Sequence, residues 1–128
     1  ASDGYKRQEW VSESERSRSA MRRLFRHEGM IVSRVVKGKE REGVKYADYF
    51  DSSELLRRIP SHRLLALLRG ERERVLRLTA APDETRALEQ LERIFVRGDS
   101  PAREQVEAAV KDGYKRLLKP SMEAEAIA

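Results

Sequence analysis

The stretch SESERSRSAMRRLFRHEGMIVSRVVKG, residues 12–38, sets the expectation for the whole chain because its apolar residues follow a helical period. These residues are Met21, Leu24, Phe25, Ile31, Val32, Val35 and Val36. Their spacing predicts one long amphipathic helix from Ser12 to Gly38. Gly29 lies inside this helix at a cost of about 1 kcal/mol relative to Ala, so we expect it to mark a bend or a close helix contact.

Shorter elements are predicted after this helix, between breaks in the pattern. The run Asp51–Glu54 fits a capping box that opens a short helix, and Pro60 ends that helix. Ser61 then caps a helix over residues 62–70. Residues 74–79 fit either a strand or a continued helix, and the break that follows them favours an extended stretch.

Three more helices are predicted in the C-terminal part of the chain. The first begins at Pro82 and ends at Gly98, because Pro suits a first helical position and Gly a position after the last. The second begins at Ser100-Pro101 and ends at Pro120, and Ser121 caps the third. The apolar spacing predicts the inner faces of the first two helices, which are Leu88, Leu91, Ile94 and Phe95 for the first and Val106, Val110, Tyr114, Leu117 and Leu118 for the second.

The fold class expected from these elements is all-α. We expect an irregular array of about five to six helices, with at most one short strand or hairpin near residues 74–79. Residues 1–128 then form a single helical segment, with a basic half over 12–79 and a helical hairpin half over 80–128. Residues 122–128 carry no stop signal and the chain lacks a starting Met, so we expect a piece of a larger multidomain protein.

The charge is unevenly distributed. The chain has 27 Lys and Arg against 22 Asp and Glu, a net charge of +5. Residues 16–45 hold 10 basic and 3 acidic side chains, and residues 57–77 hold 7 and 2. This asymmetry indicates an anionic partner for the basic half. The alternative is an ordinary solvated surface whose cations pair within the chain.

Several classes of protein are excluded or disfavoured by composition. The chain has no Cys, so it has no disulfide and no thiolate metal site, which fits a reducing, cytoplasmic setting. It shows no apolar run near the roughly 20 residues of a membrane span and no signal peptide. Apolar faces without partner helices could make such a fragment dimerise.

Four blocks in the sequence resemble one known family. They are residues 35–40 (VVKGKE), 46–51 (YADYFD), 59–70 (IPSHRLLALLRG) and 114–121 (YKRLLKPS). Their identity, order and approximate spacing resemble those of the bacterial Tex family of transcription accessory proteins. The resemblance covers roughly residues 20–125, almost the whole chain.

The resemblance implies a larger parent protein. Tex-family proteins are several times longer and carry an N-terminal helical region, an RNase-H-like domain, helix-hairpin-helix elements and a C-terminal RNA-binding OB-fold. They are similar to a eukaryotic elongation factor that engages RNA polymerase and histones. The matching blocks belong to the helical part before the RNase-H-like domain, so the OB-fold is absent here. Family members often have Pro where this chain has Leu55, and Gly where it has Arg74.

No residue pattern in the chain points to catalysis, a cofactor or a metal. Ser61 and His62 are adjacent on a predicted helix and point about 100° apart, so they cannot act as nucleophile and base. Asp48, Asp51 and Glu54, spaced by three, could share a helix face and bind magnesium. Helix capping and pairing with neighbouring Arg side chains is the alternative explanation of these carboxylates.

The sequence therefore predicts a non-catalytic helical scaffold module of a Tex-like transcription accessory protein. This module would position nucleic-acid-binding domains and meet RNA, DNA and the transcription machinery through its parent, with no small-molecule substrate, no cofactor and no membrane. The alternative is direct, sequence-independent nucleic-acid binding by the basic half. The residues assigned to that binding are Arg34, Lys37, Lys39, Arg41, Arg57, Arg58 and Arg63.

Overall fold

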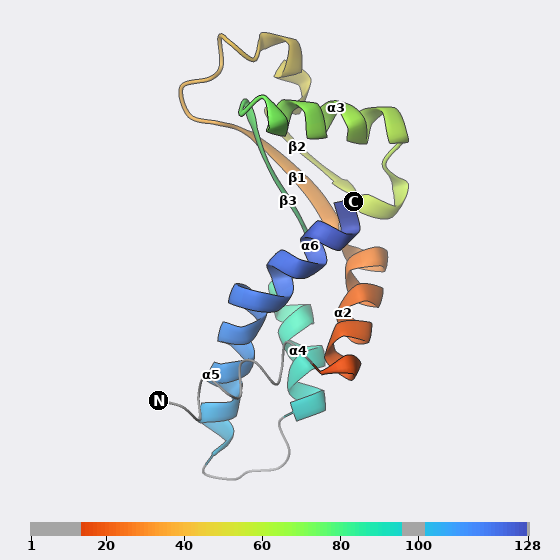
Figure 1. The fold of residues 1–128 in the computed structure, drawn as a ribbon, viewed down its shortest axis with the longest axis vertical. Coiled ribbons are helices and arrows are strands. Elements are labelled where there is room, and N and C mark those ends of the chain that lie inside the picture. The colour runs from red at the N-terminus through yellow and green to blue at the C-terminus, as the bar shows by residue number, and fades with distance from the viewer. Residues whose placement is uncertain (1–13, 96–101, 128) are drawn as a thin grey trace.

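The computed structural model describes residues 14–95 and 102–127. Within them the chain forms two lobes stacked along one long axis (Figure 1). The sheet lobe, residues 30–81, holds a three-stranded antiparallel sheet and one covering helix. The helical lobe packs the first described helix against helices from the C-terminal half. The predicted stop at Gly98 and the helix start at Ser100-Pro101 lie outside the described residues.

The predicted long helix over 12–38 is wrong, because the chain changes from helix to strand at Gly29. Helix α2 spans Glu15–Glu28 and strand β1 spans Met30–Val35. The Gly29 N–H still donates to the Phe25 carbonyl, at 2.9 Å, but its backbone is already extended, with ψ 133°. A side chain at this position would overlap the Phe25 carbonyl oxygen, so only Gly fits.

The all-α expectation is also wrong, because β1 is the central strand of a sheet. Its neighbours are β2 (Asp51–Leu55) and β3 (Leu76–Ala81), in the order β2-β1-β3. Both pairs are antiparallel, with Ile31 opposite Glu54 on one side and opposite Ala80 on the other. Residues 30–36 are mostly β-branched, and that composition favours a strand when a sheet is available to pair with. The extended stretch expected at 74–79 is confirmed in β3.

The predicted capping box at Asp51–Glu54 does not open a helix. These residues form β2, and only Leu56–Arg58 make a single 3-10 turn before Pro60. Helix α3 then spans Ser61–Arg72 and agrees with the predicted helix over 62–70, although no side-chain cap bond forms at its start. The predicted cap does not form, because pairing with β1 satisfies more backbone hydrogen-bonding groups than one helix cap would.

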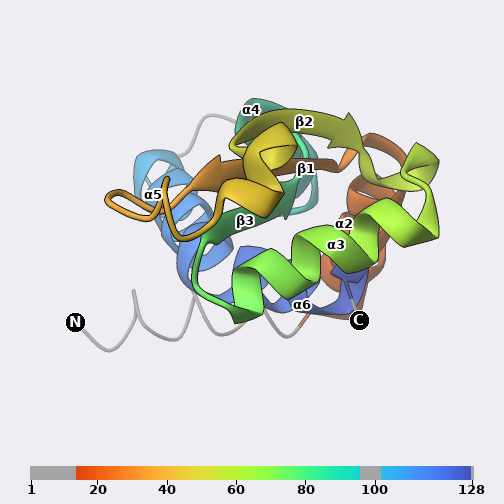
Figure 2. The same ribbon diagram turned by 90° about the horizontal axis from the view of Figure 1, so that it is seen from above.

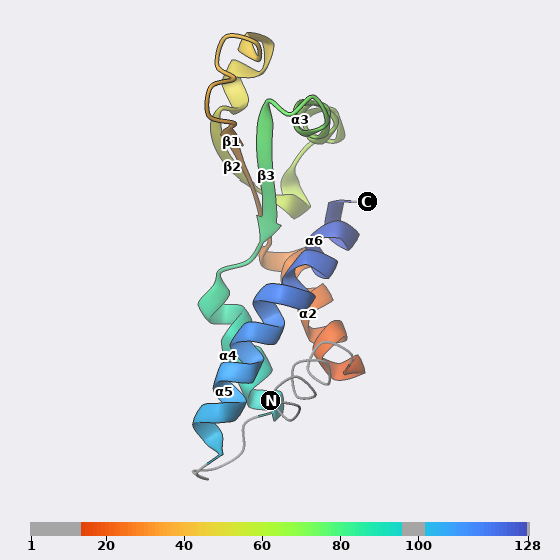
Figure 3. The ribbon, with the colours of Figure 1, turned by 60° about the vertical axis from the view of Figure 1, so that its left-hand side comes forward.

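Helix α3 covers one face of the sheet and encloses a small core (Figures 2 and 3). The buried residues of this core are Ile31, Tyr46, Leu67, Val75, Leu76 and Leu78. Tyr46 comes from a 3-10 helix over Val44–Tyr49 in the β1–β2 connection. Side chains alternate between the two faces of the sheet along each strand. The face that points away from α3 therefore carries Val32, Arg34 and Thr79.

The helical lobe continues from β3 into helix α4 (Glu84–Phe95). Helix α5 (Arg103–Gly113) runs through a π-helical turn, Tyr114–Leu118, into helix α6 (Lys119–Ile127). The predicted helix end at Pro120 and the predicted cap at Ser121 are both wrong, because the helix continues through these residues. Pro120 has no N–H, and the turn before it shifts to the wider period, with the Lys119 N–H bonded to the Tyr114 carbonyl.

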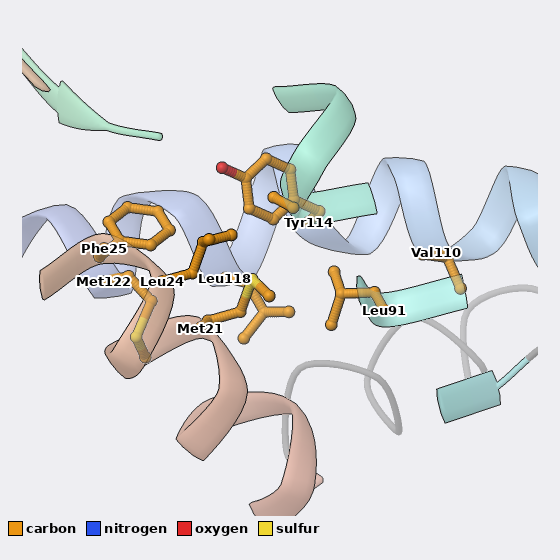
Figure 4. Packing of buried hydrophobic residues seen from close by; sticks show 9 residues of the cluster. Met21, Leu24, Phe25, Leu91, Val110, Tyr114, Leu118 and Met122 are labelled. Atoms are coloured by element: carbon orange, nitrogen blue, oxygen red, sulfur yellow. The ribbon is translucent and has the colours of Figure 1, made fainter. Parts of the chain in front are cut away.

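The core of the helical lobe joins α2 to the three C-terminal helices (Figure 4). Its buried residues are Met21, Leu24, Phe25, Ala87, Leu91, Val110, Tyr114, Leu118 and Met122. The inner face predicted for the last helices is largely confirmed, since Leu91, Val110, Tyr114 and Leu118 are fully buried. Leu117, also expected there, is 38% exposed.

The two lobes are joined by direct contacts as well as by the chain. The Ala80 N–H on the outer edge of β3 donates to the Glu123 carboxylate on α6, at 2.8 Å. Glu125, two residues further along α6, bonds Arg22 on α2 within the helical lobe, at 2.8 Å. Helix α6 therefore bridges the sheet and α2, as Figure 3 shows.

Candidate nucleic-acid interface

The seven residues assigned to nucleic-acid binding do not form one surface. Lys37, Lys39 and Arg41 lie in the loop after β1, at the end of the sheet far from the helical lobe (Figure 1). Arg57 and Arg58 lie at the other end, after β2. The six residues of β1 separate the two ends by about 20 Å.

Three of the seven are already paired with carboxylates. Arg34 on β1 bonds Asp51 on β2, at 2.7 Å. Arg63 on α3 makes two hydrogen bonds to Glu54, at 2.7 and 2.8 Å, and these raise the pKa of Arg63. Lys39 pairs with Glu42 within its own loop, at 3.2 Å. These cations contribute less free positive charge than the sequence implied.

The structure brings other cations to the loop after β1. The ladder between β1 and β3 continues past its ends, with the Val36 N–H donating to the Val75 carbonyl at 2.8 Å. The end of α3 and the start of β3 therefore lie beside the loop. We define the basic tip as the exposed cations of these segments: Lys37, Arg41, Arg72, Arg74 and Arg77.

A second contact fixes the two segments of the basic tip together. The Tyr46 hydroxyl donates to the Glu73 carboxylate, and Lys45 pairs with the same carboxylate at 3.2 Å. The hydrogen bonds from Tyr46 and then Lys45 hold the pKa of Glu73 below its usual range. Burial, followed by the Glu73 contact, raises the pKa of Tyr46. Gly43 packs directly on Val75, where a larger residue would overlap the Val75 side chain.

Arg74 occupies an unusual backbone position at this tip. It has φ 64°, the left-handed region. The Arg74 N–H bonds the Glu71 carbonyl and the Val75 N–H bonds the Gly70 carbonyl, both at 3.0 Å, which is the Schellman arrangement that ends many helices. Gly is the usual residue there, and an Arg costs about 1 kcal/mol or more.

The three carboxylates considered for magnesium do not converge. Residues three apart on a strand lie on opposite faces, so Asp51 and Glu54 of β2 point apart. Each is also engaged by a different Arg, Arg34 and Arg63. Among residues 14–95 and 102–127, no group of three or more His, Asp or Glu side chains is placed to hold a metal ion.

Two grooves lie away from the basic tip. One of about 590 Å³ runs beside β2 and α3 and is lined by Tyr49, Ser53, Glu54 and Arg63, among others. Another of about 270 Å³ lies between α2, the turn after β2 and α6, and its lining includes Arg57. Arg57 therefore belongs to the junction between the lobes.

A helix that crosses a membrane is about 20 residues long and mostly apolar. No helix within residues 14–95 and 102–127 combines the length and the apolar character that crossing a bilayer requires.

Comparison with known proteins identifies the family. The family model described as Tex central region-like matches residues 8–127. The chain belongs to the Tex central region-like family. The four sequence blocks that suggested this family are spread over β1, the β1–β2 connection, α3 and the bent C-terminal helix.

Curated relatives share about half of this Tex central region. The Transcriptional accessory protein Tex of Neisseria gonorrhoeae is 48% identical over 68 residues, which is 52% of this chain and 9% of the relative. Protein YhgF of Escherichia coli K12 is 55% identical over 53 residues, 41% of this chain and 7% of the relative. YdcI of Bacillus subtilis is 32% identical over 81 residues, 62% of this chain and 11% of the relative. The aligned parts therefore cover about a tenth of these relatives.

Both departures from the Tex pattern fall where the backbone accepts either residue. Leu55, where Pro is frequent, has φ −61°, close to the value that a Pro ring imposes. The ladder alternation also turns its N–H away from β1, so a Pro there would remove no ladder bond. Arg74, where Gly is frequent, has the positive φ that Gly adopts most easily.

Proposed function

We propose that this Tex central region is a non-catalytic scaffold module of a transcription accessory protein. Its role is to hold neighbouring parts of a longer chain at a fixed separation and orientation. The observation that carries this proposal is the position of α6 between the lobes: its Glu123 bonds β3 of the sheet lobe, and its Glu125 bonds α2 of the helical lobe, to which α6 itself belongs. The helix-to-strand change at Gly29 has no loop, so it too supports a stiff junction.

The proposal that the module is non-catalytic is supported by the state of its polar side chains. Asp51 and Glu54 each pair with an Arg, which leaves them poorly placed to bind a metal or a water nucleophile. Ser61 and His62 both lie exposed at the start of α3, adjacent in sequence and pointing apart. We propose nucleic acid and the transcription machinery as partners of the parent protein, because the Neisseria relative is a transcriptional accessory protein.

A distance measurement tests the scaffold role. The chain has no Cys, so two introduced cysteines can carry spin labels at chosen positions. Leu65→Cys on α3 and Lys111→Cys on α5 report on the separation of the lobes, since both positions are exposed. The control pair, Glu89→Cys and Lys111→Cys, lies within the helical lobe.

We expect the distance distribution between lobes to be as narrow as that of the control pair. A broad or two-peaked distribution for Leu65→Cys with Lys111→Cys, beside a narrow control, would contradict a rigid scaffold. Magnesium-dependent cleavage of labelled RNA that disappears in Asp51→Asn would contradict the non-catalytic proposal.

A further inference from the structure

We propose that the basic tip binds the phosphate backbone of a nucleic-acid duplex without reading its bases. This inference goes beyond the scaffold role and does not depend on it. The tip combines two segments that are more than thirty residues apart in the sequence, 37–41 and 72–77. Neither segment alone forms the surface, which exists because Val36 pairs with Val75.

The tip cations differ from other Arg side chains of the chain in their ion pairs. Arg22, Arg63 and Arg86 each bond a carboxylate on another element, at distances from 2.7 to 2.8 Å. In the described part of the chain no ion pair engages any of the five tip cations. Of the four acidic residues within 37–42 and 71–77, Glu42 and Glu73 are used by Lys39 and Lys45. Only Glu40 and Glu71 remain to offset the five cations.

One tip residue, Arg77, faces a like charge across the sheet. Arg77 on β3 lies directly opposite Arg34 on β1. Directly opposed like charges destabilise an antiparallel pair. Asp51 neutralises Arg34 from the other side, at 2.7 Å, whereas Arg77 has no carboxylate partner among the described residues. An anion bound beside Arg77 would relieve this repulsion.

Arg74 supplies an independent reason to place a ligand here. It stands at the apex of the turn between α3 and β3 in a left-handed conformation that Gly adopts without strain. Strained residues that persist in a fold often serve a binding site. Arg74 carries a positively charged guanidinium that Gly would lack, and we infer that this charge binds an anion.

The chemistry of the tip favours duplex phosphates over other anions. Guanidinium groups bond phosphate oxygens in pairs, and four of the five tip cations are Arg. Tyr46 is only 5% exposed, so this aromatic ring cannot stack on bases. Without stacking, affinity depends on charge density, which is higher in a duplex than in a single strand. Val44, 70% exposed, is the one large apolar side chain exposed near the tip in the described residues, too little to insert into a membrane.

A salt titration with matched variants tests the proposal on the 128-residue chain. Polarisation of a short labelled DNA duplex of mixed sequence gives Kd between roughly 50 and 200 mM salt. The tip variant is Arg72→Gln with Arg77→Gln. The control variant is Arg57→Gln with Arg58→Gln, which removes the same charge from exposed residues at the opposite end of the sheet.

The tip variant should bind about tenfold more weakly, and its salt slope should fall by about 2, one for each lost phosphate contact. The control variant should keep the wild-type slope. Arg74→Gly should weaken binding while raising Tm, because it removes a charge and relieves the positive φ. This opposite response separates a lost contact from a damaged fold.

Four outcomes overturn the assignment. One is no duplex binding by the wild-type chain at low salt. Another is an equal loss in the tip and control variants, which would indicate a general charge effect. Tighter binding of single-stranded nucleic acid than of duplex would contradict the proposed binding to the phosphate backbone of a duplex. Competition by polyglutamate as strong as by duplex, at equal charge, would assign the tip to an acidic protein instead.

Discussion

The two lobes bury their polar groups in different ways. In the sheet lobe, the Tyr46 hydroxyl donates to Glu73 and the Ser33 hydroxyl to the Tyr49 carbonyl, at 2.6 Å for the latter. In the helical lobe, the Ser17 and Tyr114 hydroxyls are buried with no hydrogen-bond partner among the described residues. The helical lobe encloses the larger apolar cluster, with Tyr114 tilted against Phe25 at 6.5 Å between ring centroids.

This difference indicates what stabilises each lobe. A large apolar cluster tolerates an unpaired hydroxyl, because burial of its side chains offsets the lost hydrogen bond with water. The small core of the sheet lobe depends more on its polar contacts. Burial raises the pKa of Tyr114, with smaller contributions from Glu84 and Glu123, so its hydroxyl stays neutral.

Gly29→Ala should cause the largest loss of stability. The added Cβ would overlap the Phe25 carbonyl oxygen, which belongs to fixed helix backbone. We expect the free energy of unfolding to fall by about 3 kcal/mol in a denaturant titration. The matched control is Gly38→Ala, whose position has open space but φ 87°. It should cost only about 1 kcal/mol, from backbone strain alone. Equal costs would show that the junction is not tightly packed.

Removal of a single hydroxyl should have opposite consequences in the two lobes. Tyr46→Phe loses a hydrogen bond to a carboxylate, and Tm should fall by about 3–6 °C. Tyr114→Phe removes a hydroxyl without a described partner, and the free energy of unfolding should stay constant or rise by up to about 1 kcal/mol. Thermal unfolding by circular dichroism measures both. A large loss in Tyr114→Phe would mean that its hydroxyl is bonded, and the contrast between lobes would fail.

Acid should loosen the sheet lobe before the helical lobe, as the smallest of these effects. The pKa of Glu73 lies below its ordinary value of 4.5, mainly because of the Tyr46 and then the Lys45 hydrogen bonds. A lowered pKa stabilises the fold above the ordinary value, and this contribution disappears as the pH falls through the folded pKa. Arg86 and Arg22 likewise lower the pKa of Glu28 and Glu125, so the helical lobe also weakens in acid. The sheet lobe should loosen first because its apolar core is smaller and depends more on polar contacts.

Hydrogen exchange of backbone amides at decreasing pH measures this order. Amides of β1 and β3 should lose protection at a higher pH than those of α4. Glu73→Gln should reduce the pH dependence in the sheet lobe, and Glu125→Gln serves as the control in the helical lobe. Simultaneous loss of protection in both lobes at every pH would show that they respond as one unit.

Part of the fold could be predicted from local sequence. Helices α3 and α4 are predicted because Pro, Gly and apolar spacing mark them, whereas the extended stretch of β3 is favoured over a continued helix only by the break that follows it. The two mistaken helices share one cause. Residues 30–36 and 51–54 fit helix and strand patterns equally well over short windows, and only their mutual pairing selects the strand. The pairing of β1 with β3 places Lys37 near Arg74, and Arg57 lies at the opposite end of the sheet.

The sequence by itself determined the family, through four short blocks in order, and the excess of positive charge. It also determined the inner face of the C-terminal helices, because spacing along one helix is a local property. Only the tertiary structure decided where α2 ends, which carboxylate neutralises which Arg, and which cations are left unpaired at the tip. Those outcomes depend on backbone hydrogen bonds and charges between segments far apart in the chain, and local periodicity carries no information about them.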